Sequence, residues 1–460
     1  MALGRQRDRQ SDMMVSWAEM PRSPGHVFYD RLQAELIAAG FDGFVEGLCA
    51  RFYAARRGRP SLPPGRYFRM LLVGYFEGID SVRGLDWRCS DSLSLRVFLR
   101  LGEREPVPDH SWLSRTRSRL PLELHDQVFT WVLQRLADHG LIRGERIGVD
   151  GSTMQANAAL HTIVRREGGE TYREMLRRMA AESGIETPTA DDLMRLDRNR
   201  RGKTLSSTEW ESPTDPDATI ARMKDGRTHL AYKPEHTVDL DTGAVVAAEM
   251  HPADQGDTAT MPGTLASAAA HLADVDAAPT PDNPAELVAD KGYHSRAGLK
   301  AIADGPWKSR VAEPRREGFL RWHGDDAARR AVHNNRARLL CEVARQAFKL
   351  RAELVERGFA LILDRGGMRR AWLRGRENVH KRYLIHVAGY NLGLIMRLLT
   401  GAGTPRGSLA RLSVCFGAIP TSNGGCILLL VVVAADQTAA LTIGLQPDPP
   451  TRKQTSSTGL

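Results

Sequence analysis

The chain has 460 residues, of which 42% are hydrophobic, and a mean hydropathy of −0.36. This size and composition suit a soluble protein of two or three domains with a sizeable core. The net charge of +9 and the isoelectric point of about 9.5 indicate a polyanionic partner, unless arginine-rich codon usage alone raises the charge. The five cysteines include no Cys-x-x-Cys pair, which excludes a zinc ribbon or a disulfide framework and favours a reducing, cytoplasmic setting.

The two ends of the chain differ in composition from the rest. Residues 1–25 are polar and charged and lack the apolar segment of a signal peptide, so we expect a flexible leader. Residues 401–460 are rich in Ser, Thr, Gly and Pro, which predicts a disordered tail. The longest apolar run, residues 426–435, is too short to span a bilayer, so we expect no membrane partner.

Residues 26–142 predict an all-helical domain. Phe28, Leu32 and Leu36 recur at the helical period of 3.6 residues, and Pro63 and Pro64 precede an apolar stretch, as at a helix start. A further helix from about residue 108 carries Arg115, Arg117 and Arg119. Short helices with basic side chains suit duplex DNA in the manner of a helix-turn-helix. A plain scaffold with a solvated basic face is the alternative.

A short buried strand follows this domain. Ile147 and Val149 are β-branched, and Asp150 ends the run before Gly151. A carboxylate at the end of a central strand stands on a rigid platform, where a divalent metal ion is best held. A plain strand-end turn is the alternative.

The chain then turns polar before regular structure resumes. Residues 154–227 predict a long, partly flexible insertion with one helix over 171–183, whose basic clusters either grip phosphates or are solvated. Beyond it we expect strands at 229–240 and 244–250, a helix at 258–272, a strand at 287–290, a helix at 295–303 and a strand near 308–313. This order, followed by helices from residue 325, predicts an α/β mixed sheet covered by helices.

Two further carboxylates join Asp150 as candidate ligands. Asp290 ends the second short apolar strand, and Glu356 lies near the edge of the apolar face of a helix. Together they supply three hard oxygen ligands, which Mg²⁺ prefers. The alternatives are a strand-end cap for Asp290 and an exchange of Glu356 with Glu353, one turn away.

In this order the motifs resemble those of a DDE transposase of a bacterial insertion sequence. The resemblance covers residues 28–399 and is carried by the segments 149–152, 290–295 and 355–359, with support from 108–115, 369–378 and 391–394. Asp150 and Asp290 are 140 residues apart, and Asp290 and Glu356 are 66 residues apart. These spacings fit a catalytic domain with an insertion after its first strand.

The resemblance implies a ribonuclease H-like catalytic core over residues 143–400. It implies that the protein binds the terminal inverted repeats of an element and target DNA, and that it cleaves and joins DNA with two Mg²⁺ or Mn²⁺ ions. Asp150, Asp290 and Glu356 would be the catalytic residues and metal ligands, with Asp150 bridging both ions. A homo-oligomer, associated with the nucleoid in the cytoplasm, would bring two element ends together.

The chain departs from the family pattern near the glutamate. Related transposases often carry a basic residue seven positions after the glutamate, where this chain has Leu363. They also often carry an aromatic residue or an arginine before the glutamate, where this chain has Ala352. Arg365, Lys349 or Arg351 are the available substitutes. The departure leaves two alternatives open, a decayed DNA-binding protein and a metal-dependent nuclease without strand transfer.

Basic residues around the acidic motifs are candidate DNA contacts. Between residues 308 and 397 they outnumber acidic ones, and Lys291 follows the second aspartate directly. We expect phosphate contacts from Lys291, Arg369, Arg370, Arg374, Arg376 and Lys381. A solvated helix face is the alternative. Trp322 and Trp372 are expected in the core, with a role in stacking as the alternative.

Overall fold

The computed structural model describes residues 27–54, 58, 61–200, 205–223, 225–315, 322 and 324–408, together with the backbone of the short strands β10 (Ile419–Pro420) and β11 (Cys426–Ile427). The expected leader 1–25, and the expected tail beyond residue 408 apart from these two strands, lie outside the described residues. Among the helices described, none is long and apolar enough to cross a membrane.

The predicted N-terminal helical region is confirmed. Its helices are α1 (Val27–Ala38), α2 (Phe41–Cys49), the short η2 (Ala50–Phe52), α3 (Pro64–Glu77), α4 (Val82–Ser90), α5 (Leu93–Phe98), α6 (His110–Arg119) and α7 (Leu122–Asp138). Their starts follow local chemistry: Ser92 and Asp109 cap α5 and α6 with side-chain oxygens, and Pro64 is the first residue of α3. Because α3 is buried along nearly its whole length, it forms the centre of this bundle.

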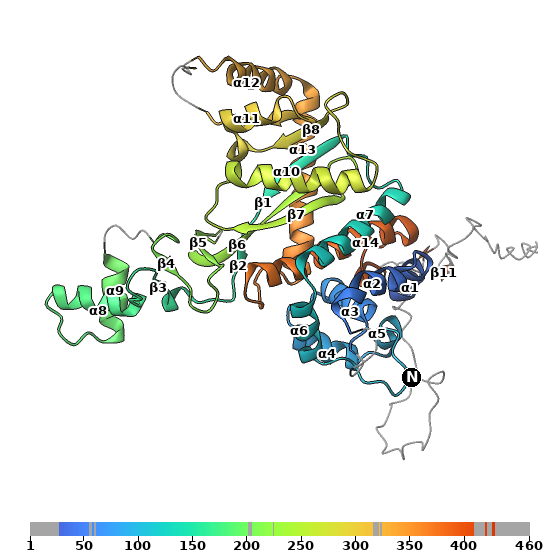
Figure 1. Ribbon diagram of the computed structural model, residues 1–460, viewed down its shortest axis with the longest axis horizontal. Helices are drawn as coiled ribbons and strands as arrows, with labels where there is room; N and C mark the ends of the chain where they lie inside the picture. The colour runs from blue at the N-terminus through green and yellow to red at the C-terminus, as the bar shows by residue number, and fades with distance from the viewer. Residues whose placement is uncertain are drawn as a thin grey trace, which may run out of the picture.

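The long helix α14 (Arg376–Thr400) returns to the N-terminal helices from the far end of the chain. It packs against α7 and α3, and Figure 1 shows it running beside α7. Arg382 is buried in α14 and donates to the backbone carbonyls of Ile79 and Asp80. The apolar core therefore continues without a break from Phe28 in the first helix to Val245 in the sheet.

The central sheet has the strand order β7-β6-β1-β8-β9. The strands are β1 (Arg146–Gly151), β6 (Thr228–Asp239), β7 (Val245–Pro252), β8 (Ala285–Ala289) and β9 (Trp307–Val311). β6 runs antiparallel to both β1 and β7, and β1, β8 and β9 run parallel. This is the strand order of a ribonuclease H-like fold, so the predicted α/β class with a mixed sheet is confirmed.

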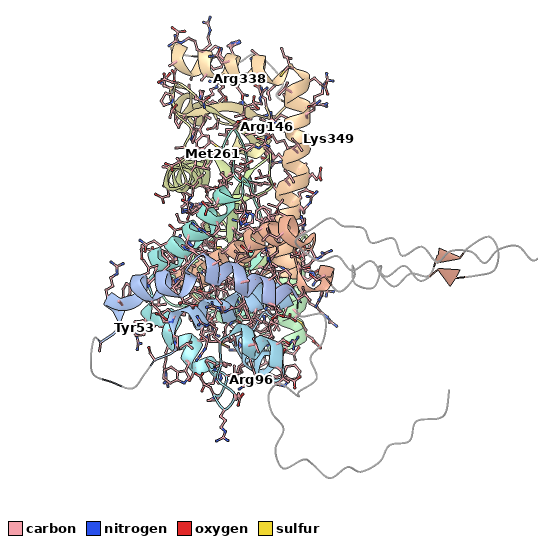
Figure 2. All side chains as sticks on the ribbon, turned by 90° about the vertical axis from the view of Figure 1, so that its right-hand side faces the viewer. Tyr53, Arg96, Arg146, Met261, Arg338 and Lys349 are labelled. Atoms are coloured by element: carbon pink, nitrogen blue, oxygen red, sulfur yellow. The ribbon has the colours of Figure 1, made fainter. Side chains whose placement is uncertain are left out.

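Helices cover both faces of the sheet. On one face lie α10 (Asp257–Asp274), α11 (Arg296–Ile302) and α12 (Asp326–Leu339), and on the other lies α13 (Glu342–Phe359), which continues as a π-helical turn η5 (Ala360–Arg365). Figure 2 shows the helices that carry Met261 and Lys349 on opposite sides of the strand that begins at Arg146. Successive side chains of a strand point to opposite faces of the sheet. Ile147 and Val149 pack toward α10, whereas Gly148 and Asp150 face α13.

The insertion is more ordered than predicted. The expected helix is confirmed as α8 (Tyr172–Glu182), but the described part also contains η3 (Leu160–Thr162), β2 (Met154–Gln155), β3 (Val164–Arg165), α9 (Ala190–Asn199), β4 (Trp210–Glu211) and β5 (Thr219–Arg222). The side chain of Trp210 is buried against Tyr172 and Arg165. β3 pairs with β4 from far along the chain, a contact that local patterns do not reveal. Figure 1 shows α8 and α9 projecting away from the sheet.

Two buried asparagines close the edges of the sheet. Asn391 of α14 accepts from the N–H of Val245 at 3.0 Å and donates to its carbonyl at 2.8 Å, on edge strand β7. Asn335 of α12 makes the same pair of bonds to Val311 on edge strand β9, at 2.9 and 2.8 Å. Each side-chain amide stands in for a neighbouring strand and satisfies backbone groups that an edge otherwise leaves unpaired.

A buried histidine links the N-terminal helical region to α10, one of the helices that pack on the sheet. His271 of α10 contacts the Val246 carbonyl with Nδ1 at 2.9 Å, and its Nε2 lies 3.1 Å from Oδ1 of Asp126 on α7. Burial lowers the pKa of His271, but the adjacent Asp126 carboxylate and the Val246 carbonyl raise it, and the net pKa lies above the usual value of 6.5.

Replacing Asp126 by asparagine is expected to destabilise the protein by about 1 kcal/mol at pH 6. Because the folded state raises the pKa of His271, the ion pair's contribution is fully present below pH 6.5 and is lost as the pH rises through the folded-state pKa. Urea unfolding of both proteins between pH 5.5 and 9 measures the difference. A difference that stays constant over this range contradicts the assignment.

Candidate metal centre

The structure places two of the predicted acidic residues side by side. Val149 of β1 and Ala289 of β8 are paired neighbours in parallel strands, so Asp150 and Asp290 are the next residues on strands about 4.8 Å apart. The N–H of Gly151 donates to Asp150 Oδ1 at 2.9 Å. The N–H of Gly292 donates to Asp290 Oδ1 at 2.8 Å at the start of the short helix η4 (Lys291–Tyr293), so a nearby backbone N–H orients each carboxylate.

The charge state of Asp150 reflects its surroundings. Burial raises its pKa to about 6, the nearby carboxylates of Asp290 and Asp257 raise it as well, and Arg351 and the Gly151 N–H lower it. Burial and repulsion between carboxylates both disfavour the charged form. A cation placed between the two aspartates would relieve both effects.

Arg351 is the basic residue in contact with Asp150. Its Nη2 lies 3.0 Å from Asp150 Oδ2, and its Nε donates to the Val149 carbonyl at 3.1 Å. Of the three substitutes considered for the missing basic residue, Arg351 alone among the described contacts meets an acidic motif residue. Lys349 and Arg365 are exposed, and Leu363, at the family's basic position, is buried in the core.

Glu356 is not grouped with the two aspartates in this structure. It lies on α13, which packs against β1 and β8, but its side chain is exposed. It follows Arg351 by five residues, a rotation of about 140° around a helix, so the two side chains point in different directions. Over the described ranges no three His, Cys, Asp or Glu side chains are placed to hold a metal ion. Glu353, the alternative to Glu356 as a ligand, forms an i,i+4 ion pair with Arg357.

The rest of α13 explains this orientation. Val355 is buried, and Phe359 stacks on the ring of His236 with 4.0 Å between ring centroids. His236 also bonds the hydroxyl of Tyr383 at 2.7 Å. This buried packing, in which His236 is a structural residue, sets the rotation of α13 over β1.

A third carboxylate near the aspartates was not predicted. A Cβ atom at Gly292 would lie 2.2 Å from Oδ2 of Asp257 and 3.1 Å from Oδ1 of Asp290, so those two oxygens are no more than the sum of these distances, 5.3 Å, apart. Asp257 is the first residue of α10 and pairs with Lys233 at 2.6 Å. In the sequence it is indistinguishable from an ordinary acidic residue in the first turn of a helix.

A buried polar network supports this part of the sheet. Glu235 on β6 has no exposed surface and accepts hydrogen bonds from the hydroxyls of Tyr293 at 2.7 Å and Thr260 at 2.8 Å, and also from Thr264. Lys233 lies 3.4 Å from the same carboxylate. Because Tyr293 follows Asp290 by three residues, the network holds the turn that positions Asp290. No sequence pattern identified Glu235 or Lys233.

Most of the predicted DNA contacts lie on the surface. The exposed ones are Lys291, Arg115, Arg119, Arg369, Arg370, Arg374 and Arg376. Arg119 lies over the ring of Tyr53, and Arg369 pairs with Asp364 while 44% of its side chain remains exposed. These side chains are accessible to a phosphate backbone.

Two of the predicted DNA contacts are buried or partly buried. Lys381 is only 4% exposed, pairs with Glu377 at 2.6 Å and donates to the Arg117 carbonyl. Arg117 is itself largely buried, and burial lowers its pKa. Both lie where α14 packs on α6, so we do not carry them forward as phosphate contacts.

The two tryptophans were expected in the core, and for Trp372 this is wrong. Its side chain is 46% exposed, and its Nε1 donates to Oδ2 of Asp80 at 2.7 Å. Trp322 packs against the core cluster on the α10 face, with Arg296 over its ring. Trp372 therefore joins the segment of residues 369–376 to the N-terminal helical region.

Comparison with known families matches two separate regions of the chain. Residues 24–119 match the family described as Transposase domain (DUF772), and residues 202–392 match the one described as Transposase DDE domain. The chain belongs to the DDE transposases. The second match contains Asp290 and Glu356, whereas Asp150 precedes it. No curated protein and no solved structure matches the transposase.

Membership of this family determines the general activity. The transposase is an enzyme that acts on DNA, and DDE transposases use divalent metal ions. The residues at the ends of β1 and β8 fit such an ion, because they offer carboxylate oxygens on rigid strand ends and lack thiol or imidazole ligands that would favour softer metals.

Proposed function

We propose that this transposase binds the terminal inverted repeats of an insertion sequence and catalyses metal-dependent DNA cleavage and strand transfer. The observation that carries the proposal is the adjacency of Asp150 and Asp290 at the ends of parallel strands, in a chain whose family match includes Asp290 and Glu356. Residues 26–142 then bind DNA and residues 143–400 carry the reaction, with 154–227 as an insertion.

In this proposal the acidic residues hold two Mg²⁺ or Mn²⁺ ions. Asp150 and Asp290 would supply oxygen ligands from the strand ends, and Glu356 would supply the third ligand from α13. When bound, such ions activate a water or a 3′-hydroxyl and stabilise the leaving oxygen. Because Glu356 is exposed and rotated away from Asp150, completing the set requires a shift of α13 against β1.

A segment of arginines beside the aspartates supports a DNA path there. The Gln155 N–H donates to the Arg369 carbonyl at 3.1 Å, and the Gln155 carbonyl accepts from the Ala371 N–H at 2.7 Å. Gln155 follows Asp150 by only five residues. The exposed side chains of Arg369, Arg370, Arg374 and Arg376 therefore extend from a backbone that is paired with the segment following β1, where they meet phosphates of DNA that runs past the proposed metal site.

Replacing both Arg374 and Arg376 by glutamine is expected to weaken DNA binding and to lower the salt dependence. Each lost phosphate contact reduces the slope of log K against log salt by about 0.9. Fluorescence anisotropy with an inverted-repeat duplex at several salt concentrations measures both quantities. Arg345→Gln is the control, since Arg345 is exposed and pairs only with Glu342 among the described contacts. An unchanged slope in the double variant favours the solvated-face interpretation.

The function is tested by incubating the protein with Mg²⁺, end-labelled inverted-repeat DNA and a target plasmid. Joined product supports the proposal. Nicked DNA without joining instead supports a metal-dependent nuclease. A shifted but intact band supports a decayed DNA-binding protein, the alternative that Leu363 and the exposed Glu356 favour. An assembly of at least two copies is expected on the repeat DNA, because two ends must meet.

A further inference from the structure

The guanidinium of Arg351 engages the strand end at the proposed metal site with two groups. Nη2 lies 3.0 Å from Oδ2 of Asp150, and Nε donates to the Val149 carbonyl at 3.1 Å. Only 11% of the side chain of Arg351 is exposed. An ion pair in such a shielded position is screened less by solvent and salt than one on the open surface.

The backbone of β1 leaves room for this arginine. A Cβ atom at Gly148 would lie 3.3 Å from Cγ of Arg351, closer than most carbon contacts, and 2.7 Å from a methyl group of Leu240. The glycine thus lets the aliphatic part of Arg351 cross the strand two residues before Asp150. The contact is therefore built into the packing of α13 on β1.

Each oxygen of Asp150 has one polar partner and keeps room for a further ligand. Oδ1 accepts from the Gly151 N–H, and Oδ2 faces Arg351. A divalent ion that takes Asp150 as a ligand needs at least one of these oxygens, and the guanidinium occupies the side on which α13 lies. Since Arg351 and Glu356 are about 140° apart on the helix, the rotation that brings Arg351 to Asp150 turns Glu356 away.

We propose that Arg351 is a positioning residue that neutralises Asp150 in the metal-free protein, and that a divalent ion binds by displacing its guanidinium. This inference rests on the proposed function, because it takes Asp150 as a metal ligand. Arg351 then stabilises the metal-free fold and lowers the affinity for metal. Its release frees α13 to bring Glu356 toward the strand ends.

The test is Mn²⁺ binding by the full-length protein without DNA, measured by isothermal titration calorimetry. Arg351→Gln is expected to bind Mn²⁺ about tenfold more tightly, because the ion then neither displaces a guanidinium from Asp150 Oδ2 nor is repelled by its charge. Its melting temperature without metal is expected to fall, and its rise on adding Mn²⁺ to exceed that of wild type. Neither metal-linked change follows from a purely structural role.

Two further variants separate this effect from loss of charge or loss of fold. Arg357→Gln removes the same charge from the same helix, but Arg357 is paired with Glu353, so wild-type affinity is expected. Arg351→Lys keeps the charge and loses the planar fork that reaches Val149. It is expected to bind Mn²⁺ with an affinity between those of wild type and Arg351→Gln, and it serves if the glutamine variant does not fold.

The outcomes distinguish this inference from the function on which it rests. If Asp150→Asn loses Mn²⁺ binding while the Arg351 variants bind like wild type or more weakly, Arg351 does not compete with the metal and the inference is overturned. If Asp150→Asn binds Mn²⁺ as tightly as wild type, the metal centre itself is misplaced. Tighter binding by Arg351→Gln alone, with Arg357→Gln unchanged, supports the inference.

Discussion

Replacing Asp150 by asparagine is expected to reduce DNA cleavage by about a thousandfold or more while DNA binding stays close to wild type. The asparagine amide keeps the shape of the side chain and removes the charge that a bridging divalent ion needs. Losing several kcal/mol of transition-state stabilisation corresponds to this factor. Cleavage of end-labelled inverted-repeat DNA in Mg²⁺ and anisotropy of the same duplex measure the two effects.

The same loss is expected for Asp290→Asn, which lies beside Asp150 across the β1–β8 pair. Glu353→Gln is the matched control, since Glu353 is exposed on α13 and pairs with Arg357 rather than facing the strands. It is expected to cleave like wild type. Cleavage by Asp150→Asn at the wild-type rate would remove the aspartate from the metal centre and with it the proposed mechanism.

Replacing Asn391 by leucine is expected to destabilise the fold by about 2–5 kcal/mol. Leucine fills a similar volume but leaves the N–H and the carbonyl of Val245 without their hydrogen-bond partner in a fully buried place. Each unsatisfied buried group costs about 1–3 kcal/mol. Urea unfolding followed by circular dichroism, with the slope held common to both proteins, measures the change.

A comparison within α12 provides the control. Asn335→Leu removes the equivalent clamp from Val311 at the opposite edge of the sheet and is expected to destabilise by a similar amount. Asn334→Leu, at the exposed neighbouring position, is expected to change stability by less than about 0.5 kcal/mol. If Asn391→Leu changes the free energy of unfolding no more than Asn334→Leu does, the hydrogen bonds of Asn391 to Val245 contribute nothing to stability.

The hydrogen bonds of Asn391 to Val245 give a structural role to residues 391–394, one of the segments that support the family resemblance. Asn391 was part of a motif that pointed to the family, without a role of its own. It is buried and holds β7 from α14. A motif residue can thus serve the fold while the chemistry lies elsewhere.

The predicted elements agree with the structure where the chemistry is local. Asp109 caps α6 through its own side chain, and Thr171 forms a capping box with Glu174 at the start of α8. Such signals involve residues within one turn of each other, so the sequence contains them in full. The second helix of the insertion, α9, has the same kind of capping box at Thr189 and could have been predicted from it.

The partners of the candidate site could not be predicted in this way. Arg351 meets Asp150 from 201 positions away along the chain, and Asp257 reaches Asp290 from the first turn of α10. Each has an ordinary local context. Their roles depend on how two helices lie on opposite faces of one sheet, which no local pattern encodes.

The exposure of charged side chains was the property that sequence patterns predicted least well. Lys381 resembled a surface lysine among other basic residues, yet α14 is buried along most of its length between α7, α3 and β7. Packing on several sides removes a long side chain from solvent and obliges it to find a partner, here Glu377. Arg374 and Arg376, at the entrance to the same helix, remain exposed.

The family resemblance implied the ribonuclease H-like core, whereas the residues by themselves determined the order of helices and strands outside the insertion and the two aspartates that end the central strands. These follow from periodicity, capping and strand-end motifs, which act over a few residues. Only the tertiary structure decided which cation meets Asp150, which way Glu356 points and which arginines reach solvent. Those outcomes depend on the rotation of α13 and the burial of α14, and both are set by packing between residues far apart in the chain.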